Sequence, residues 1–422
     1  MRSLILKGTV CYSVSPKELA VYENSYVICV DGVSKGVFEH IPPEYAPLPV
    51  LDYGGNLIVP GMVDLHIHAP QYTFRGTGMD LELMDWLQQQ AFPEEARFES
   101  GDYAEDAYAI FAAQLKNSAT TRAVVFGTRH GGSTEILMEK LEQTGLVTYV
   151  GKVNMDQNAP EPLVEESADA SEADTLGWLE RTAGRFERTR PILTPRFIPS
   201  CSRGLLEKLA VIRRERNLPV QSHLSENPGE IAFVQELFPE EPTYGHCYER
   251  YGLLGENTIM AHCVYSSPEE VALLKEKGTF VAHCPASNTN LASGIAPVRR
   301  YLDGGLRLGL GSDVAGGHTE SMFRAITDAV QMSKLYWRLV DENCMPLCFA
   351  EAFYLATLGG GRFFGKVGSF APGYEFDALV LDESDMPHWS DMNPRQRLEQ
   401  YAYLEKGGSS LQAKFVCGRQ IL

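Results

Sequence analysis

Two histidines separated by one residue, His66 and His68, are the pair in this chain best suited to metal chemistry. They close an apolar run that begins at Leu57 and is interrupted by Pro60 and Gly61. Residues two apart in an extended strand point to the same side, so both imidazoles project together where a buried strand ends. Histidine is the commonest metal-binding side chain, and the pair suits two ligands of one ion. On its own, the pair is equally typical of structural histidines.

Other polar residues follow short apolar runs in the same way. In barrels of alternating strands and helices, residues at the carboxyl ends of the strands build the active site. A single histidine at a strand end is usually structural. Five of the ten histidines lie at such ends together with an aspartate, which favours one shared site. Beyond the first pair, the strand-end residues are Arg196, His223, His262, His283 and Asp313.

The apolar runs that must position these residues alternate with helical patterns. One helix is well marked over 268–277, with Ser267 as N-cap, Pro268 at its first position and Gly278 after its end. Eight strand-like runs with helices between them, over roughly 300 residues, predict a (β/α)8 barrel. Besides the run before His66, they are 123–126, 147–153, 192–194, 220–222, 259–261, 280–282 and 306–310.

Both ends of the chain carry short β-like runs instead, at 26–30 and 36–38 and again at 377–381 and 414–417. We expect the two ends, residues 1–58 and 366–422, to pair into one small β domain. The barrel would then span residues 59–365. The predicted fold class is α/β, a TIM-type (β/α)8 barrel with a small β domain formed by both chain ends.

Composition restricts the partners and the compartment. The 422 residues include 37 basic and 55 acidic side chains, and the net charge of −18 repels phosphate backbones and anionic membranes. Nine scattered cysteines without a CxxC pair indicate reduced thiols. No apolar run resembles a secretion signal or a membrane span. We expect a soluble cytoplasmic protein without nucleic acid or membrane partners.

Several short segments share patterns with known proteins. They are 61–72, 80–87, 92–95, 154–156, 194–197, 221–227, 260–262, 282–288, 309–317 and 371–380. Through these segments the chain resembles the amidohydrolase superfamily over nearly its whole length. Within that superfamily it resembles the branch of mononuclear nucleobase deaminases. Within that branch, Pro-Gln-Tyr at 70–72, Pro-Arg-Phe at 195–197 and Asp-Val-Ala-Gly-Gly at 313–317 indicate guanine as the substrate.

Ligand chemistry supports the metal site that the resemblance implies. His66, His68, His223 and Asp313 offer three neutral nitrogens and one carboxylate, which leaves room for a water molecule. These ligands suit one Zn²⁺, although Fe²⁺ is compatible with the same atoms. Relatives with two metals bridge them by a carboxylated lysine at the fourth strand, where this chain has Arg196. We therefore expect a single ion.

The resemblance implies hydrolysis of guanine to xanthine and ammonia, by attack of a metal-bound hydroxide on the amine-bearing ring carbon. Glu226 lies three residues after His223 and is expected to move a proton from the water to a ring nitrogen and later to help ammonia leave. His262 is expected to orient the hydroxide. Asp313 is expected to bind the metal and also to accept a proton.

A planar purine base requires hydrogen-bonding groups and an apolar surface. Gln71 offers a donor and an acceptor, and Arg196 offers a fork of donors for the carbonyl oxygen and a ring nitrogen. Phe197 or Trp86 can cover a face of the ring. The residues expected to touch the base are Gln71, Trp86, Arg196, Phe197, His223 and Glu226.

The connection over residues 71–98 is long for a link between a strand and a helix, and we expect it to act as a lid. Inside it, residues 88–91 (Gln-Gln-Gln-Ala) stand where relatives have a more aromatic sequence, so a reshaped pocket is expected. His283 matches a superfamily position of uncertain role, and His318 is expected at the surface or behind the ligands. Four further histidines are expected to be structural: His40, His130, His246 and His388.

Two other functions stay open on the sequence. A mononuclear amidohydrolase acting on a cytosine, an adenosine derivative, a pterin or a triazine would use the same ligands. A barrel that serves only as a scaffold would typically lack metal ligands, which this chain retains. A zinc site of the cytidine-deaminase type is excluded, because it requires His-x-Glu and Pro-Cys-x-x-Cys. The family resemblance also implies a homodimer.

Overall fold

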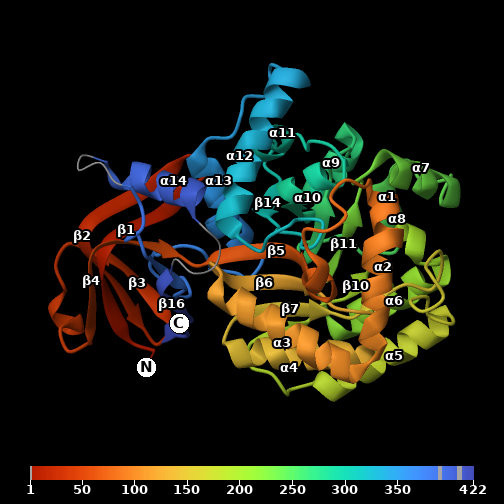
Figure 1. Cartoon of the computed structure of the whole chain (residues 1–422), viewed down its shortest axis with the longest axis horizontal. Helices are drawn as coiled ribbons and strands as arrows, with labels where there is room; N and C mark the ends of the chain where they lie inside the picture. Colours follow the sequence, from red (N-terminus) through yellow and green to blue (C-terminus); the bar gives the residue numbers. More distant parts are fainter. Residues whose placement is uncertain (1, 388–391, 406–410) are drawn as a thin grey trace.

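A mixed sheet built from both ends of the chain stands beside a barrel of parallel strands (Figure 1). The computed structural model describes residues 2–387, 392–405 and 411–422. The strand order in the sheet is β17-β16-β15-β4-β1-β2-β3, and every neighbouring pair is antiparallel except β1 with β4. The predicted pairing of the two chain ends is confirmed. The strands are β1 (Leu4–Ser15), β2 (Glu18–Val30), β3 (Val33–Phe38), β4 (Val50–Pro60), β15 (Ala378–Leu381), β16 (Leu411–Val416) and β17 (Arg419–Gln420).

The barrel strands run parallel and close on themselves, which confirms the (β/α)8 prediction. Backbone bonds join the last strand to the first, because the Asp313 amide donates to the His66 carbonyl (2.8 Å) and the His68 amide to the Val314 carbonyl (3.0 Å). The strands are β5 (Met62–His68), β6 (Thr120–Phe126), β7 (Val147–Gly151), β8 (Val153–Asn154), β9 (Thr189–Pro191), β10 (Thr194–Pro195), β11 (Val220–Leu224), β12 (Thr258–His262), β13 (Phe280–His283) and β14 (Arg307–Leu310).

The fourth barrel strand differs from the prediction. The expected run, 192–194, lies mostly between β9 and β10, with only its last residue in β10. Proline has no amide hydrogen to donate, and Pro191 and Pro195 flank the run, so the ladder is interrupted there. The chain still continues the barrel, because the Ile192 amide donates to the Val150 carbonyl (3.0 Å) and Leu193 bridges to Val220.

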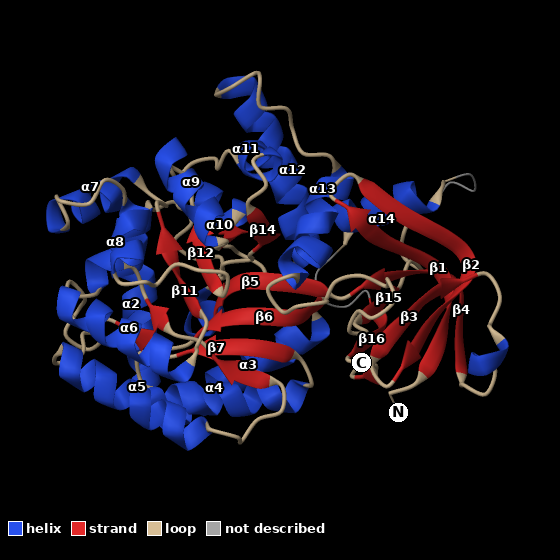
Figure 2. Cartoon of the chain, turned by 180° about the vertical axis from the view of Figure 1, so that it is seen from behind, coloured by secondary structure: helices blue, strands red, loops and turns tan. Residues whose placement is uncertain are grey.

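Helices cover the outside of the barrel (Figure 2). The predicted helix at 268–277 is confirmed as α9: the Ser267 side chain accepts from the Glu270 amide, and Gly278 ends the helix with a φ of +69°. Among the described helices, none combines the length and apolar character needed to cross a membrane. The helices are α1 (Leu83–Trp86), α2 (Phe92–Ala96), α3 (Gly101–Asn117), α4 (Gly131–Thr144), α5 (Ala168–Thr182), α6 (Arg203–Arg216), α7 (Pro228–Leu237), α8 (Tyr244–Arg250), α9 (Pro268–Lys277), α10 (Pro285–Asn290), α11 (Val298–Asp303), α12 (Met322–Leu339), α13 (Phe349–Tyr354) and α14 (Pro394–Leu404).

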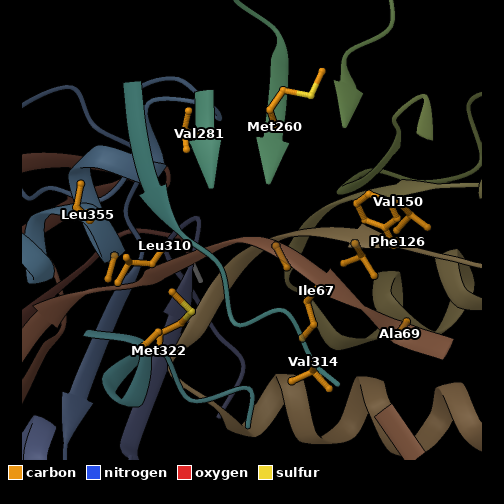
Figure 3. Packing of buried hydrophobic residues seen from close by; sticks show 14 of the residues in the cluster. Ile67, Ala69, Phe126, Val150, Met260, Val281, Leu310, Val314, Met322 and Leu355 are labelled. Atoms are coloured by element: carbon orange, nitrogen blue, oxygen red, sulfur yellow. The ribbon is translucent and has the colours of Figure 1, made fainter. Parts of the chain in front are cut away.

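The core has an inner and an outer layer. On β13, Phe280 and Ala282 belong to a small cluster that fills the barrel, whereas Val281 between them belongs to the large cluster that includes helix residues. Period-2 alternation explains this division, because a strand covered on both faces is apolar on both. Figure 3 shows part of the outer cluster, which includes Val281 and Leu310 on strands and the helical Met322 and Leu355.

Buried polar contacts attach the end sheet to the barrel. Arg122 on β6 donates from Nε to the Asp377 carboxylate (2.6 Å), and both side chains are almost fully buried. Lys414 on β16 donates to the carbonyls of Lys116 and Ser118 (both 2.9 Å), at the carboxyl end of α3. The sheet is therefore attached by one buried ion pair and by hydrogen bonds from a buried lysine to backbone carbonyls.

Candidate metal centre and active site

Four donor atoms converge at the carboxyl end of the barrel. Nε2 of His68 lies 3.2 Å from Nε2 of His66 and 3.2 Å from Nε2 of His223. Oδ1 of Asp313, which follows β14, is 3.1 Å from Nε2 of His66 and 3.4 Å from that of His68. The structure thus brings together all four residues expected as metal ligands, from β5, β11 and the segment after β14.

The state of these side chains fits a metal ion. Burial lowers the pKa of His66, His68 and His223, which favours the neutral form of each ring. Nδ1 of His223 lies 2.6 Å from the Arg196 carbonyl, and donation to it leaves the lone pair on Nε2 facing the other rings. Burial opposes the charge of Asp313, but the neighbouring His66 lowers the pKa of its carboxyl below the usual range. Three neutral nitrogens and a carboxylate can hold one divalent cation.

The placement of the two β5 histidines depends on a break in the strand register. Val63 and Leu65 belong to the inner barrel cluster, and Ile67 belongs to the outer one. Strict alternation along β5 would place the His66 side chain on the other face of the strand from Leu65, outside the barrel. The pairing of β5 with β6 shifts between Asp64 and Ile67, so the two rings turn toward the mouth above Leu65.

Asp64 holds the backbone next to two ligand residues, at His66 on β5 and at Ser312, which precedes Asp313. Sequence reasoning gave Asp64 no role. The Ser312 hydroxyl donates to Oδ2 of Asp64 (2.5 Å), and the amides of Ser312 (3.0 Å) and His66 (3.1 Å) donate to Oδ1. Burial raises the pKa of this carboxyl to about 7. Its partner lies 248 residues away, so only the closed barrel reveals the contact.

Glu226 lies beside the donor cluster, just after β11. Its Oε2 is 3.4 Å from Nε2 of His262, and its Oε1 accepts from the Ser293 hydroxyl (3.1 Å). Burial raises the pKa of Glu226 to about 7, although His262 works in the opposite direction. The Glu230 carboxylate holds the Glu226 backbone amide at 3.0 Å. A carboxyl of this kind exchanges protons readily near neutral pH.

His262 is held from its other side. Its Nδ1 lies 2.9 Å from Oδ1 of Asn288, while its Nε2 makes no hydrogen bond to any residue that the structure describes and is 3.7 Å from Oδ2 of Asp313. Burial acts against the charged ring, but Glu226 and Asp313 raise its pKa above the usual value. His262 therefore faces both carboxylates across the cavity.

Four non-glycine residues at the strand ends of the mouth have left-handed backbones. The φ angles are +49° at Ser225, +73° at His262, +50° at Cys263 and +48° at Asp313. Each such residue costs of order 1–3 kcal/mol and persists only where the surroundings enforce it. The strain lies where strands end beside the donor cluster, as is typical of functional sites.

The cavity above the donor atoms has a polar floor and an apolar wall. Trp86 and Phe197, expected to cover the base, both line it. None of the glutamines over 88–90 lines it, and Gln88 and Gln89 are exposed. The lining is completed by His68, Gln71, Leu83, Leu87, Arg196, His223, Glu226, Glu230, His262, Leu291, Asp313 and Gly316.

A buried carboxylate links the two residues expected to read the base, and sequence reasoning missed it. Glu95 on α2 accepts two bonds from Arg196, at 2.5 and 3.0 Å, and one from Nε2 of Gln71 (2.7 Å). Oε1 of Gln71 accepts from the Ala315 amide at 3.1 Å. The available signal was Phe92, which lies one helical turn before Glu95 and marks the buried face.

The remaining histidines lie apart from the cavity. Burial lowers the pKa of His283 to about 3, and its ring does not line the cavity. His318 is exposed, and its Nδ1 is 3.2 Å from Nδ2 of Asn290. His388 lies outside the described residues. Within the described part of the chain, two sets of side chains lie close enough to share an ion: His66, His68 and His223, and His66, His262 and Asp313. His40, His130 and His246 are absent from these groups and from the cavity lining.

Comparison with known proteins gives a consistent result. The sequence model of the Amidohydrolase family matches residues 57–411. The chain is 36% identical over 403 residues to a guanine deaminase of Dictyostelium discoideum, covering 90% of this chain and 88% of the relative. It is 42% identical over 339 residues to that of Rattus norvegicus, covering 79% and 74%. A crystal structure of guanine deaminase from C. acetobutylicum, with guanine in the active site, superposes with a TM-score of 0.96 at 42% identity and covers 100% of both chains.

Proposed function

The chain belongs to the amidohydrolase family, and on that premise we propose that it hydrolyses guanine to xanthine and ammonia. It is a hydrolase that acts on a carbon–nitrogen bond of a cyclic amidine. One observation carries the assignment: a single cavity joins a donor set for a metal, a buried carboxyl and a fork of base-reading groups. The solved relative that holds guanine has the same fold over its whole length.

His66, His68, His223 and Asp313 are the proposed ligands of one zinc ion, and iron(II) is the alternative that the same atoms accept. A bound ion of this type lowers the pKa of a water molecule, so that hydroxide is available near neutral pH. Arg196 follows the fourth strand and is engaged with Glu95, which supports a site for one ion rather than two.

Glu226, His262 and Asp313 are the proposed catalytic residues. Glu226 has a pKa of about 7 and can accept a proton at its carboxylate, donate it to a ring nitrogen and then assist the departure of ammonia. His262 donates toward the oxygen nucleophile and orients it. Asp313 lies beside His262 and is a second proton acceptor through a carboxylate oxygen that does not bind the metal.

The base is proposed to lie between the apolar wall and the polar floor. Arg196 donates to its carbonyl oxygen and a ring nitrogen, and Gln71 bonds its edge. Trp86 and Phe197 cover the ring faces and exclude water. His223 and Glu226 complete the contacts near the reacting carbon.

The wider context is also part of the proposal. The net charge of −18 supports a free base as substrate rather than a polynucleotide or a membrane surface. All nine cysteines are free thiols, which supports a cytoplasmic location. The family resemblance supports a homodimer, which light scattering on a sizing column would detect.

The decisive experiment measures xanthine formation from guanine by protein whose metal content has been quantified. Chelation should abolish turnover, and added zinc should restore it. Ammonia release from cytosine, adenosine, pterin and triazine amines provides the control for specificity. Metal-loaded protein that is inactive on guanine, or faster on another ring, would overturn the assignment. Bound metal without any hydrolase activity would favour a scaffold instead.

A further inference from the structure

Glu95 has contacts that neither the metal site nor the proton transfers require. Its carboxylate is buried, 2% exposed, and does not line the cavity. It lies on α2, in the long connection after β5, and reaches Arg196 after the fourth strand and Gln71 after the first. We propose that Glu95 is a positioning residue that holds Arg196 and Gln71 in the geometry that reads the carbonyl edge of the base. This inference rests on the proposed function.

The hydrogen bonds of Gln71 leave its amide one orientation. Nε2 donates to Glu95 at 2.7 Å, and Oε1 accepts from the Ala315 amide at 3.1 Å. A carboxylate only accepts, and a backbone amide only donates, so a rotated Gln71 amide would oppose like groups at both ends. Glu95 thereby decides which atom of Gln71 remains available to the base.

The guanidinium of Arg196 is held in the same way. Both terminal nitrogens bond the two oxygens of Glu95, at 2.5 and 3.0 Å, and Phe92 lies under the guanidinium at 5.1 Å. Two parallel bonds fix the plane of the fork as well as its position. The remaining N–H groups of Arg196, which lines the cavity, then point in directions that the ion pair has determined.

The proposal predicts an effect on discrimination, not only on stability. Substitution Glu95→Gln keeps the volume but turns one acceptor into a donor, which faces a donor of Arg196 or Gln71. One of the two reading groups must then move. A misplacement of about 1 Å costs on the order of 100-fold in rate, so kcat/KM for guanine should fall by about that factor.

The test compares guanine with 2-aminopurine, which has the same amine and lacks the carbonyl oxygen. In Glu95→Gln, the ratio of kcat/KM for guanine to kcat/KM for 2-aminopurine should fall at least about tenfold. This is the order of magnitude expected when one hydrogen bond to the carbonyl edge is lost. Glu95→Asp keeps the charge and should preserve part of the ratio. Metal content and thermal stability are measured for every variant.

Glu351 provides the matched control. It forms a buried two-bond pair with Arg299, at 2.7 and 2.5 Å, away from the cavity. Glu351→Gln should lower stability and leave the guanine to 2-aminopurine ratio unchanged. In an Arg196→Lys background, Glu95→Gln should cost much less than in the wild type, because the fork that it aligns is gone.

The outcomes separate the positioning role from the proposed function. Wild-type protein that is inactive on guanine would overturn both. Active wild-type protein with an unchanged ratio in Glu95→Gln would overturn the role of Glu95 alone, as would equal costs in the Arg196→Lys and wild-type backgrounds. If Glu95→Gln does not fold, Glu95→Asp decides: a ratio equal to that of the wild type refutes positioning by the carboxylate geometry.

Discussion

Replacing Arg196 by lysine tests whether a fork of donors reads the base. Lysine keeps a positive charge for Glu95 but offers a single ammonium in place of the planar guanidinium. The fold and the metal ligands should therefore survive. What is lost is one of two bonds to Glu95, now at 2.5 and 3.0 Å, together with the directed N–H groups that face the cavity.

The expected magnitude follows from one charge-assisted hydrogen bond. Such a bond to a buried partner contributes about 1.5–3 kcal/mol, because the partner has no water to replace it. Arg196 is 3% exposed and lines the cavity, so a bond from its guanidinium to the base meets that condition. The corresponding loss in kcat/KM for guanine is about 10- to 100-fold. Since the bond forms in the bound substrate as well as the transition state, a large part should appear in KM.

The assay follows xanthine formation by the purified variant and the wild type, with metal content and melting temperature recorded for both. We expect equal metal per chain, a similar unfolding transition and a raised KM. A value of kcat/KM indistinguishable from that of the wild type would refute the base-reading role. Loss of metal in the variant would instead place Arg196 among the supports of His223, whose Nδ1 contacts its carbonyl.

Three further variants separate the ligands, the proton carrier and the scaffold. Asp313→Ala removes the carboxylate of the donor set, so metal per chain should fall and turnover should be lost; full metal occupancy would limit Asp313 to proton transfer. Glu226→Gln keeps the shape of the side chain, and kcat should fall about 10²- to 10⁴-fold with metal retained, whereas near-normal turnover would exclude Glu226 as the proton carrier. Asp377→Ala removes the buried carboxylate from Arg122 and leaves it the partly exposed Glu375 (2.8 Å), which should lower the free energy of unfolding in urea by about 1.5–3 kcal/mol while kcat/KM of the folded protein stays the same. A loss below about 1 kcal/mol would show that the pair behaves like an exposed one.

The local parts of the fold are predictable because their causes are local. The cap at Ser267 and the left-handed Gly278 define α9 within a dozen residues, and both are visible in the sequence. The strand runs are visible for the same reason, except where Pro191 and Pro195 divide the fourth strand. Proline removes ladder donors whatever the hydrophobic pattern around it.

The strand-end positions of the candidate site follow from the sequence, but their partners do not. His66, His68 and His223 could be placed at strand ends from the apolar runs that precede them. The register break that brings the His66 ring to the same side of the strand as Leu65 was not predictable, because it depends on how β5 pairs with β6. The donor cluster nevertheless forms, because the register break and the closure of the barrel bring Nε2 of His68 to 3.2 Å from Nε2 of His66 and of His223.

By itself, the sequence determined the class of fold, the strand ends and the residue types available there. Only the tertiary structure decided which buried groups hold them: Asp64 with Ser312, 248 residues apart, and Glu95 with Arg196, 101 residues apart. These contacts have no periodic signal, because they depend on the closing of the barrel and on the rotamers of packed side chains. A carboxylate buried by that closure must find donors, and those that Glu95 finds, Arg196 and Gln71, line the cavity.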